Sequence, residues 1–238
     1  MITVEKDNSV LARWKRWGIG FNVEPSPEPC GLEGLLVDTA EELGSNARLY
    51  VMVATWLVEH HAIVDTERLA ELALHLHGEA SAGLGLLLET AQERIGEAVF
   101  ANVIAACHPV ESPRPLYAFL RNRTGLSKLS ESTASEASRK WGLWTQRLDR
   151  LKPESLRPAS WIAKHNEAFC LRTLLKGDVR SRVLTALREE GQRNVSETDL
   201  TRRAGCTRKA MHSALDNLEQ AGLITRKLQG RKYTIMAT

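Results

Sequence analysis

The sequence predicts a mainly α-helical protein, with a bundle of helices in the N-terminal part and a smaller C-terminal domain of helices that ends in a small antiparallel β-hairpin. Two observations predict this fold class. Between residues 32 and 107, apolar residues recur at three- and four-residue steps, the spacing that places them on one face of a helix. Near the C-terminus, two β-rich runs flank Leu228-Gln229-Gly230, a pattern typical of a hairpin.

Length and composition exclude several classes of protein. A chain of 238 residues suits one large domain or two small ones, and its 43% hydrophobic content excludes a wholly disordered protein. No uncharged apolar run approaches the ~18 residues of a bilayer span, and the first residues lack the apolar core of a signal peptide, so we expect a cytoplasmic protein without a membrane partner. The cysteines form no CxxC or CxxH pair and are expected to be reduced thiols: Cys30, Cys107, Cys170 and Cys206.

The net charge of +3 conceals an uneven distribution along the chain. Residues 1–112 hold 7 Lys and Arg against 17 Asp and Glu, residues 113–177 hold 13 against 5, and residues 178–238 hold 12 against 7. An acidic front and a basic rear indicate a polyanionic partner for the rear section. The basic middle segment either adds to the surface that contacts this partner or docks against the acidic front, and both alternatives stay open.

Residues 1–31 are expected to form an N-terminal arm and a linker. Trp14, Trp17 and Phe21 stand at helical spacing beside basic residues, which predicts a short amphipathic docking element. Three prolines in residues 22–31 predict an extended linker.

The acidic segment, residues 32–112, is expected to form a bundle of about five helices. Asp65 indicates a helix start, and Gly44 and Gly78 indicate helix ends. Gly85 lies within an apolar helical run, where it marks either a close packing point or a kink. The expected helices span Leu32–Leu43, Ala47–Val58, Thr66–Leu76, Leu84–Ile95 and Ala98–Ala106.

The basic segment, residues 113–177, is expected to be a helical connector. A serine-rich stretch over residues 125–138 predicts a loop that leads into a helix over Thr133–Leu151. Trp141 lies on the apolar stripe of that helix, which either supplies a dimer surface or fills the core. A second helix is expected over Ala159–Leu175.

Residues 178–238 carry the most specific pattern. A helix is expected over residues 178–190, closed by Gly191, and the spacing of Ser196 and Asp199 is that of a capping box that opens a short helix. The remaining expected elements are a longer helix over Arg208–Ala221, capped by Thr207 and ended by Gly222, and two strands over Leu223–Lys227 and Arg231–Met236.

The order helix, capped helix, tight turn, helix and basic hairpin resembles the winged helix-turn-helix superfamily over residues 178–238. The stretch LDNLEQAGLITRKLQGRKYTI is especially similar to the entry of that superfamily into its wing. The resemblance implies binding to duplex DNA, with the second helix of the turn unit in the major groove.

The residues of the expected recognition helix agree with that implication. Its inner face carries Met211, Ala214, Leu215 and Leu218, and its outer face begins with side chains that can donate to base edges or phosphates. The alternative is a protein-interaction domain with solvated basic faces. The expected DNA-binding residues are Arg202, Arg203, Thr207, Arg208, Lys209, His212, Ser213, Arg226, Lys227, Arg231 and Lys232.

A second resemblance covers Asn166–Leu187 and the module that follows it. This stretch is similar to regulators encoded beside nucleotidyltransferase-type toxins in abortive-infection operons. The resemblance implies an antitoxin or autoregulator whose helical domain binds a toxin protein.

No catalytic, metal-binding or cofactor-binding residue is expected. His75 and His77 would lie on nearly opposite faces of a helix, and the chain has no HExxH, GxxxxGK[ST], GxGxxG or GxSxG motif. We therefore expect a sequence-specific, DNA-binding transcriptional regulator that is a homodimer. Its helical N-terminal domain is expected to serve dimerisation or the binding of an effector or partner protein.

Overall fold

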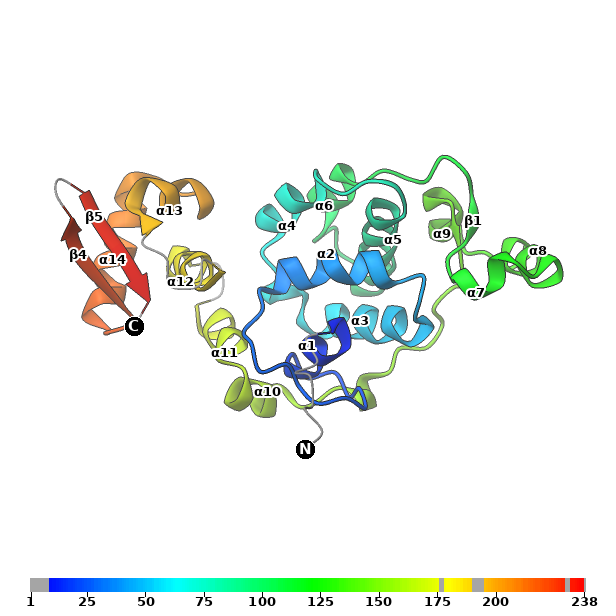
Figure 1. Cartoon of the computed structure of the whole chain (residues 1–238), viewed down its shortest axis with the longest axis horizontal. Helices are drawn as coiled ribbons and strands as arrows, with labels where there is room; N and C mark the ends of the chain where they lie inside the picture. The colour runs from blue at the N-terminus through cyan, green and yellow to red at the C-terminus, as the bar shows by residue number, and fades with distance from the viewer. Residues whose placement is uncertain (1–8, 176–177, 190–194, 230–231, 238) are drawn as a thin grey trace, which may run out of the picture. The chain divides into compact units, whose positions relative to one another are not determined.

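Helices supply most of the regular structure in the computed structural model, which describes residues 9–175, 178–189, 195–229 and 232–237 (Figure 1). The expected fold class is confirmed, because the described chain is mainly helical and carries a small antiparallel sheet. The chain divides into an N-terminal unit, residues 1–165, and a C-terminal unit, residues 166–238. Each unit is described by itself below.

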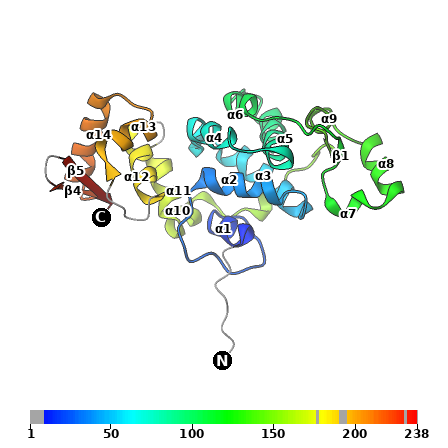
Figure 2. The ribbon, with the colours of Figure 1, turned by 45° about the horizontal axis from the view of Figure 1, so that its top comes forward.

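The core of the N-terminal unit forms around α5 (Gly78–Ile95), which packs against α2, α3, α6 and α9 (Figure 2). Residues 81–88 of α5 are buried without interruption, as expected for a helix that neighbours cover on all sides. The expected helices of the bundle are observed with shifted ends: α2 (Leu32–Glu42), α3 (Ala47–His60), α4 (Thr66–Ala73), α5 and α6 (Ala101–Ala106), with a short 3-10 turn η1 (His61–Ile63) after α3.

Gly78 does not end a helix, contrary to expectation. It is the first residue of α5, with φ of +56°, so α5 begins at Gly78 rather than at Leu84. Asp65 does open α4 as expected, because its carboxylate accepts a hydrogen bond from the backbone N–H of Arg68 at 3.0 Å.

The expected docking arm is part of the core instead. The helix α1 (Val10–Arg16) buries Trp14 completely, and Trp17 just beyond it is 1% exposed. The indole N–H of Trp14 donates to Thr39 Oγ1 at 2.7 Å, and that of Trp56 on α3 donates to the carbonyl oxygen of Trp17 at 2.7 Å. The arm folds back because burying these rings removes more apolar surface from water than any exposed arrangement.

The prediction of one helix over Thr133–Leu151 is wrong. The helix α9 (Glu136–Trp141) ends at Gly142, whose φ of +69° is a left-handed conformation that a glycine adopts without strain. Residues Leu143–Trp144 then form β2, which pairs in parallel with β1 (Arg114–Pro115). The serine-rich stretch contains a helix as well, α8 (Thr124–Ser132), which follows the short α7 (Ala118–Arg121).

The basic middle segment does not form a domain of its own. Its residues up to His165, including η2 (Pro153–Ser155) and α10 (Ala159–His165), belong to the N-terminal unit. Basic side chains of this segment pair with acidic ones on α5: Arg114 and Arg121 with Glu79 at 3.2 and 2.6 Å, and Lys140 with Glu89 at 2.8 Å. The sequence left open whether the basic segment adds to the surface for a polyanionic partner or docks against the acidic front. These three cations dock against the acidic front.

The helix expected over Ala159–Leu175 is interrupted at Asn166, the first residue of the C-terminal unit. The Asn166 side chain accepts from the backbone N–H of Phe169 at 3.2 Å and so caps a new helix, α11. The elements of this unit are α11 (Glu167–Leu174), α12 (Val179–Glu189), β3 (Val195–Ser196), α13 (Glu197–Arg203), α14 (Arg208–Gln220), β4 (Ile224–Gln229) and β5 (Lys232–Ala237).

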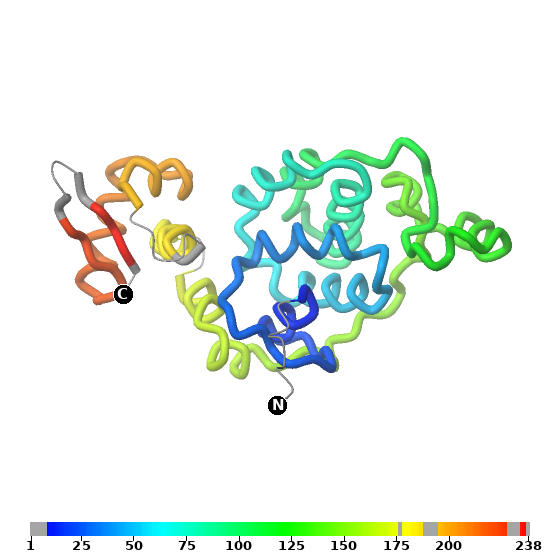
Figure 3. The backbone as a smooth tube through the Cα atoms, viewed as in Figure 1, coloured from blue at the N-terminus to red at the C-terminus, as the bar shows by residue number. Residues whose placement is uncertain are grey.

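A three-stranded antiparallel sheet closes this unit, with the strand order β3-β5-β4. The backbone tube in Figure 3 shows the last two segments of the chain, β4 and β5, running side by side in orange-red and red. The hairpin β4–β5 was expected, whereas β3 was not. The register pairs Arg226 with Ile235 and Lys227 with Thr234. One hydrophobic cluster joins α12, α13, α14 and the sheet, and its members include Val183, Leu187, Leu200, Met211, Leu215, Leu218 and Ile235. Gly191 and Gly230 lie outside the described residues.

Candidate nucleic-acid interface

Side-chain caps fix the starts of both helices of the turn unit. Ser196 Oγ accepts from the backbone N–H of Asp199 at 3.2 Å and donates to the Asp199 carboxylate at 2.6 Å. Thr207 Oγ1 accepts from the backbone N–H of Ala210 at 3.2 Å. Both expected caps are thus observed at the starts of α13 and α14.

The two faces of α14 differ completely in chemistry. The inner face is buried in the hydrophobic cluster through Met211, Ala214, Leu215 and Leu218, as the sequence predicts. The opposite face is exposed over its first two turns and carries Thr207, Arg208, Lys209, His212 and Ser213. Five of the predicted site residues are therefore brought together on one continuous surface.

Arg208 and Lys209 are the uncompensated charges of this surface. Neither has an ion-pair partner among the described residues, and both side chains are exposed. His212 is different, because its Nε2 lies 3.6 Å from the Asp216 carboxylate one turn later. The positive potential of α14 is consequently strongest in its first turn, where the helix dipole adds to it.

Arg182 is a structural residue of the site that the sequence did not single out. From α12, its guanidinium donates to the carbonyl oxygen of Ala204 at 3.0 Å, at the end of α13. Gly205 follows with φ of +55°, so the chain turns tightly toward α14. The hydrogen bond holds the C-terminal end of α13 against α12 and so contributes to the orientation of α14. Residue spacing alone does not reveal such a contact, because it joins two residues that lie 22 positions apart.

Arg226, one of the residues predicted to bind DNA, is bound to two carboxylates of α14 in the structure. Its Nε donates to Glu219 at 2.8 Å and its Nη2 donates to Asp216 at 2.7 Å, both on α14, and its side chain is only 18% exposed. These hydrogen bonds hold the pKa of the Glu219 carboxyl below its ordinary value. Arg226 therefore ties the first strand of the hairpin to α14 through two carboxylates.

The remaining basic residues predicted for the site are Arg202, Arg203, Lys227, Arg231 and Lys232. Lys227 is exposed on β4, next to Arg226. Arg202 is exposed at the end of α13 and pairs with Asp199 at 2.9 Å, while Arg203 is half-buried. Lys232 pairs with Gln229 in the register of the hairpin, and Arg231 lies outside the described residues.

The described residues hold no metal cluster, and burial shifts the pKa of two side chains of the N-terminal unit. Among the described residues, no cluster of three or more His, Cys, Asp or Glu side chains could hold a metal ion. Burial lowers the pKa of His60, whose ring packs at 5.0 Å from that of Trp56, and burial raises the pKa of the Cys107 thiol to about 11. A thiol with so high a pKa is a poor nucleophile at neutral pH.

Within the described ranges, no helix combines the length and the hydropathy needed to cross a bilayer. Comparison of the chain with family models, with curated proteins and with solved structures finds no match. The exposed cationic face of α14 is the feature on which a proposal of function rests.

Proposed function

We propose that the C-terminal unit binds duplex DNA as a winged helix, with α14 in the major groove and the β4–β5 hairpin beside it. The single observation that carries this proposal is the start of α14, where Arg208 and Lys209 are exposed and uncompensated while the opposite face is locked into the core. A major groove about 12 Å wide admits one α-helix, and recognition helices contact bases with their first residues.

The charge of the two units supports the choice of partner. Residues 166–238 hold 14 Lys and Arg against 8 Asp and Glu, a net charge of +6. Residues 1–165 hold 18 against 21, a net charge of −3. The phosphate backbone attracts clustered cations and supplies much of the affinity of such complexes, so the C-terminal unit is the part suited to DNA.

The exposed residues divide into two roles. Arg208, at the first position of α14, is suited to donate two hydrogen bonds to O6 and N7 of a guanine. Lys209 and Lys227 are suited to phosphates, which orient the protein without reading sequence. The tie from Arg226 to Glu219 fixes the hairpin relative to α14, so that both elements meet the duplex together.

These roles lead to a sequence-specific transcriptional regulator as the proposed function. A homodimer of the chain would match a palindromic operator with half-sites about one helical turn apart. The DNA upstream of the chain's own coding sequence is the first duplex to test.

The test measures binding of the full chain to a fluorescently labelled duplex of this upstream DNA by fluorescence anisotropy. Arg208→Ala should reduce discrimination between the preferred base pair and its substitutes by ~1–3 kcal/mol at one position. Lys128→Ala is the matched control, since Lys128 is an exposed cation on α8 of the N-terminal unit. The proposal fails if wild-type protein does not bind at low salt, or if Arg208→Ala discriminates as the wild type does.

A further inference from the structure

Two stretches of the N-terminal unit that lie far apart in the sequence run side by side: the loop after α1, residues 18–21, and the segment before α10, residues 152–157 (Figure 1). The backbone N–H of Gly20 donates to the carbonyl oxygen of Ser155 at 2.9 Å. An antiparallel β-bridge between the neighbouring residues adds to this contact. Backbone groups therefore hold the segment against the loop without using its charged side chains.

Three exposed cations surround this loop, and we call them the cationic cluster: Arg48, Lys152 and Arg157. Arg48 lies in the first turn of α3, and its Nη2 donates to the carbonyl oxygen of Gly20 at 3.1 Å. The backbone N–H of Arg157 donates to the carbonyl oxygen of Gly18 at 2.7 Å. Lys152 directly precedes η2, and its carbonyl oxygen accepts from the N–H of the last residue of that turn at 2.9 Å. Two distant parts of the chain thus bring three cations to one loop.

Aromatic rings orient two of these cations without neutralising them. Cζ of Arg48 lies 5.7 Å from the centre of the Phe21 ring, and Cζ of Arg157 lies 5.4 Å from the centre of the Trp161 ring. The attraction of a ring face holds a guanidinium in place and leaves its charge intact. None of the three cations of the cluster has an ion-pair partner among the described residues. The cluster therefore offers oriented donors whose charge is uncompensated.

The cluster differs in this respect from cations of the same basic segment that lie closer to α5. Arg114, Arg121 and Lys140 pair with acidic side chains of α5. Glu154 lies in η2 beside the cluster, but it is exposed and forms no ion pair with it. Exposed charges act over about 8 Å at physiological salt, so the more distant acidic side chains of this unit do not cancel the cluster. The cluster remains available to an anionic partner.

We infer that the cationic cluster binds phosphate groups of duplex DNA. A guanidinium presents a fork of donors that matches two phosphate oxygens. A single phosphate gains little from exposed cations, because water screens them, whereas a duplex carries one charge per ~1.7 Å of its axis and releases counterions at each contact. Phosphate binding by the cluster goes beyond the proposed function, while the choice of DNA as the polymer rests on that function in the same chain.

Fluorescence anisotropy of the full chain with a labelled duplex of arbitrary sequence tests the inference, with the binding constant K measured between about 50 and 200 mM salt. The cluster variant is Arg48→Met/Lys152→Met/Arg157→Met. It should flatten the slope of log K against log salt by ~1.8–2.7, because each phosphate contact contributes about 0.9. In about 50 mM salt it should bind at least about tenfold more weakly than the wild type.

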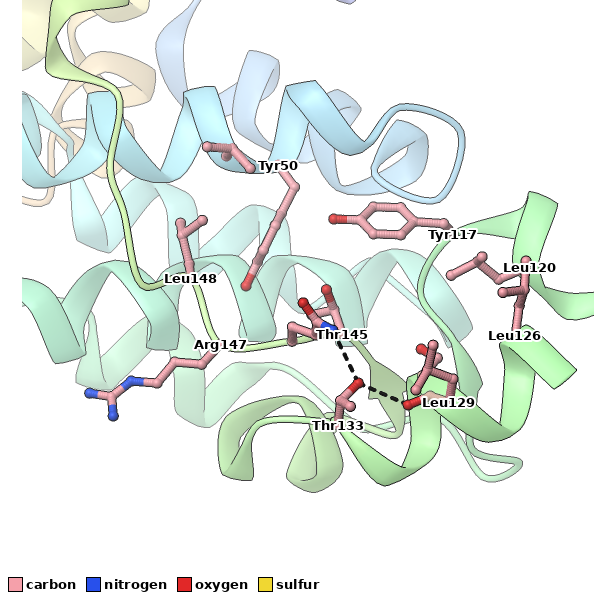
Figure 4. A pocket seen from close by; sticks show the side chains of 12 residues that line it. Tyr50, Tyr117, Leu120, Leu126, Leu129, Thr133, Thr145, Arg147 and Leu148 are labelled. Atoms are coloured by element: carbon pink, nitrogen blue, oxygen red, sulfur yellow. Dashed lines mark hydrogen bonds between the residues drawn. The ribbon is translucent and has the colours of Figure 1, made fainter.

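The matched control removes the same charge outside the cluster. Lys128 lies on α8, and Arg123 directly precedes that helix. Arg147 follows β2 and extends away from Thr133 and Leu129 (Figure 4). These three cations are exposed and have no ion-pair partner among the described residues. The control variant, Arg123→Met/Lys128→Met/Arg147→Met, should keep the wild-type slope.

Two competitors test the class of ligand at constant ionic strength. About 10 mM inorganic phosphate should not displace the duplex, because a single phosphate gains too little from exposed cations. Poly-L-glutamate should displace it about tenfold less effectively per charge than unlabelled duplex, because the duplex has the higher charge density. Displacement by inorganic phosphate, or equal displacement by poly-L-glutamate, would overturn DNA as the partner of the cluster.

The outcomes separate this inference from the proposed function. A cluster variant with the wild-type slope, or a control variant that loses as much slope, overturns the inference and does not bear on α14. Arg208→Ala/Lys209→Ala should retain the share of the slope that the cluster supplies; if this variant binds as the wild type does, the proposed function fails and the inference stands. Circular dichroism verifies folding, and Lys152→Met alone, with an expected loss of about 0.9 in slope, replaces the cluster variant if that variant is unfolded.

Discussion

Gly85→Ala is expected to destabilise the N-terminal unit although alanine is the better helix former. Gly85 lies in the middle of α5, where the Trp141 ring of α9 packs directly on its Cα. A Cβ atom added at Gly85 would lie 2.4 Å from Cη2 of Trp141, well inside van der Waals contact. Trp141 has little room to yield, because it is 3% exposed and its indole N–H donates to Glu89.

Two opposing terms set the size of the effect. Overpacking a core costs ~1–3 kcal/mol, whereas replacing glycine by alanine within a helix stabilises by about 1 kcal/mol. Because the indole is buried and hydrogen-bonded to Glu89, the cost lies in the upper part of its range, and we expect a net loss of about 1–2 kcal/mol. Gly34→Ala on α2 is the matched control: a Cβ there meets nothing within 4 Å, so this variant should be as stable as the wild type or slightly more stable.

Tryptophan fluorescence during urea unfolding of the full chain measures this difference selectively. All six tryptophans lie within residues 1–165, so the signal reports only the N-terminal unit. The midpoint should fall for Gly85→Ala and stay or rise for Gly34→Ala. A Gly85→Ala protein as stable as the wild type would refute the close packing of α9 on α5.

Two further predictions concern the C-terminal unit. Lys227→Ala should flatten the dependence of log K on log salt for DNA binding by about 0.9, while the Lys128→Ala control leaves the slope unchanged; equal slopes for both variants would show that Lys227 does not contact phosphate. Arg226→Met should remove a contribution to stability that is present above the ordinary Glu219 pKa of 4.5 and is lost as pH falls through the lowered folded-state value. The gap in unfolding free energy between wild type and Arg226→Met, followed by circular dichroism in urea, should therefore shrink between pH 6 and pH 3, and a gap independent of pH would contradict the tie to Glu219.

The C-terminal helices could be predicted closely because their signals are local. The spacing of Met211 and Leu215 gives the buried face of α14, and the hydroxyls of Ser196 and Thr207 mark the helix starts within a few residues of the groups they cap. Glycine after α14 agrees with its observed end, where Gly222 has φ of +69°. None of these features needs information from a distant part of the chain.

The elements that were predicted wrongly depend on distant partners. Trp141 and Trp144 have helical spacing, yet the second lies on a strand that forms only because Arg114–Pro115 comes alongside it. The sequence around Trp14 predicts a docking surface, whereas in the structure Trp14 is buried in contact with Thr39 and Trp56. Periodicity reports which residues prefer burial, and it does not report what buries them.

The candidate site likewise contains one feature that local spacing predicts and one that depends on contacts between separate elements. The exposed face of α14 follows from helical spacing, so Arg208, Lys209 and His212 were placed together in advance. The role of Arg226 did not follow, because it depends on how the hairpin folds against Asp216 and Glu219. The homodimer and the toxin partner remain predictions, which sedimentation analysis and co-purification with the product of an adjacent gene would test.

Protection of guanine N7 from dimethyl sulfate tests the placement of α14 in the major groove most directly, because N7 is accessible only from that groove. In about 50 mM salt, the full chain should bind its upstream duplex and protect guanines within a short site. Arg208→Ala should lose protection of at least one guanine, and Lys128→Ala should retain them all. Absence of a complex, or a complex in which every guanine N7 stays reactive, would contradict recognition by α14.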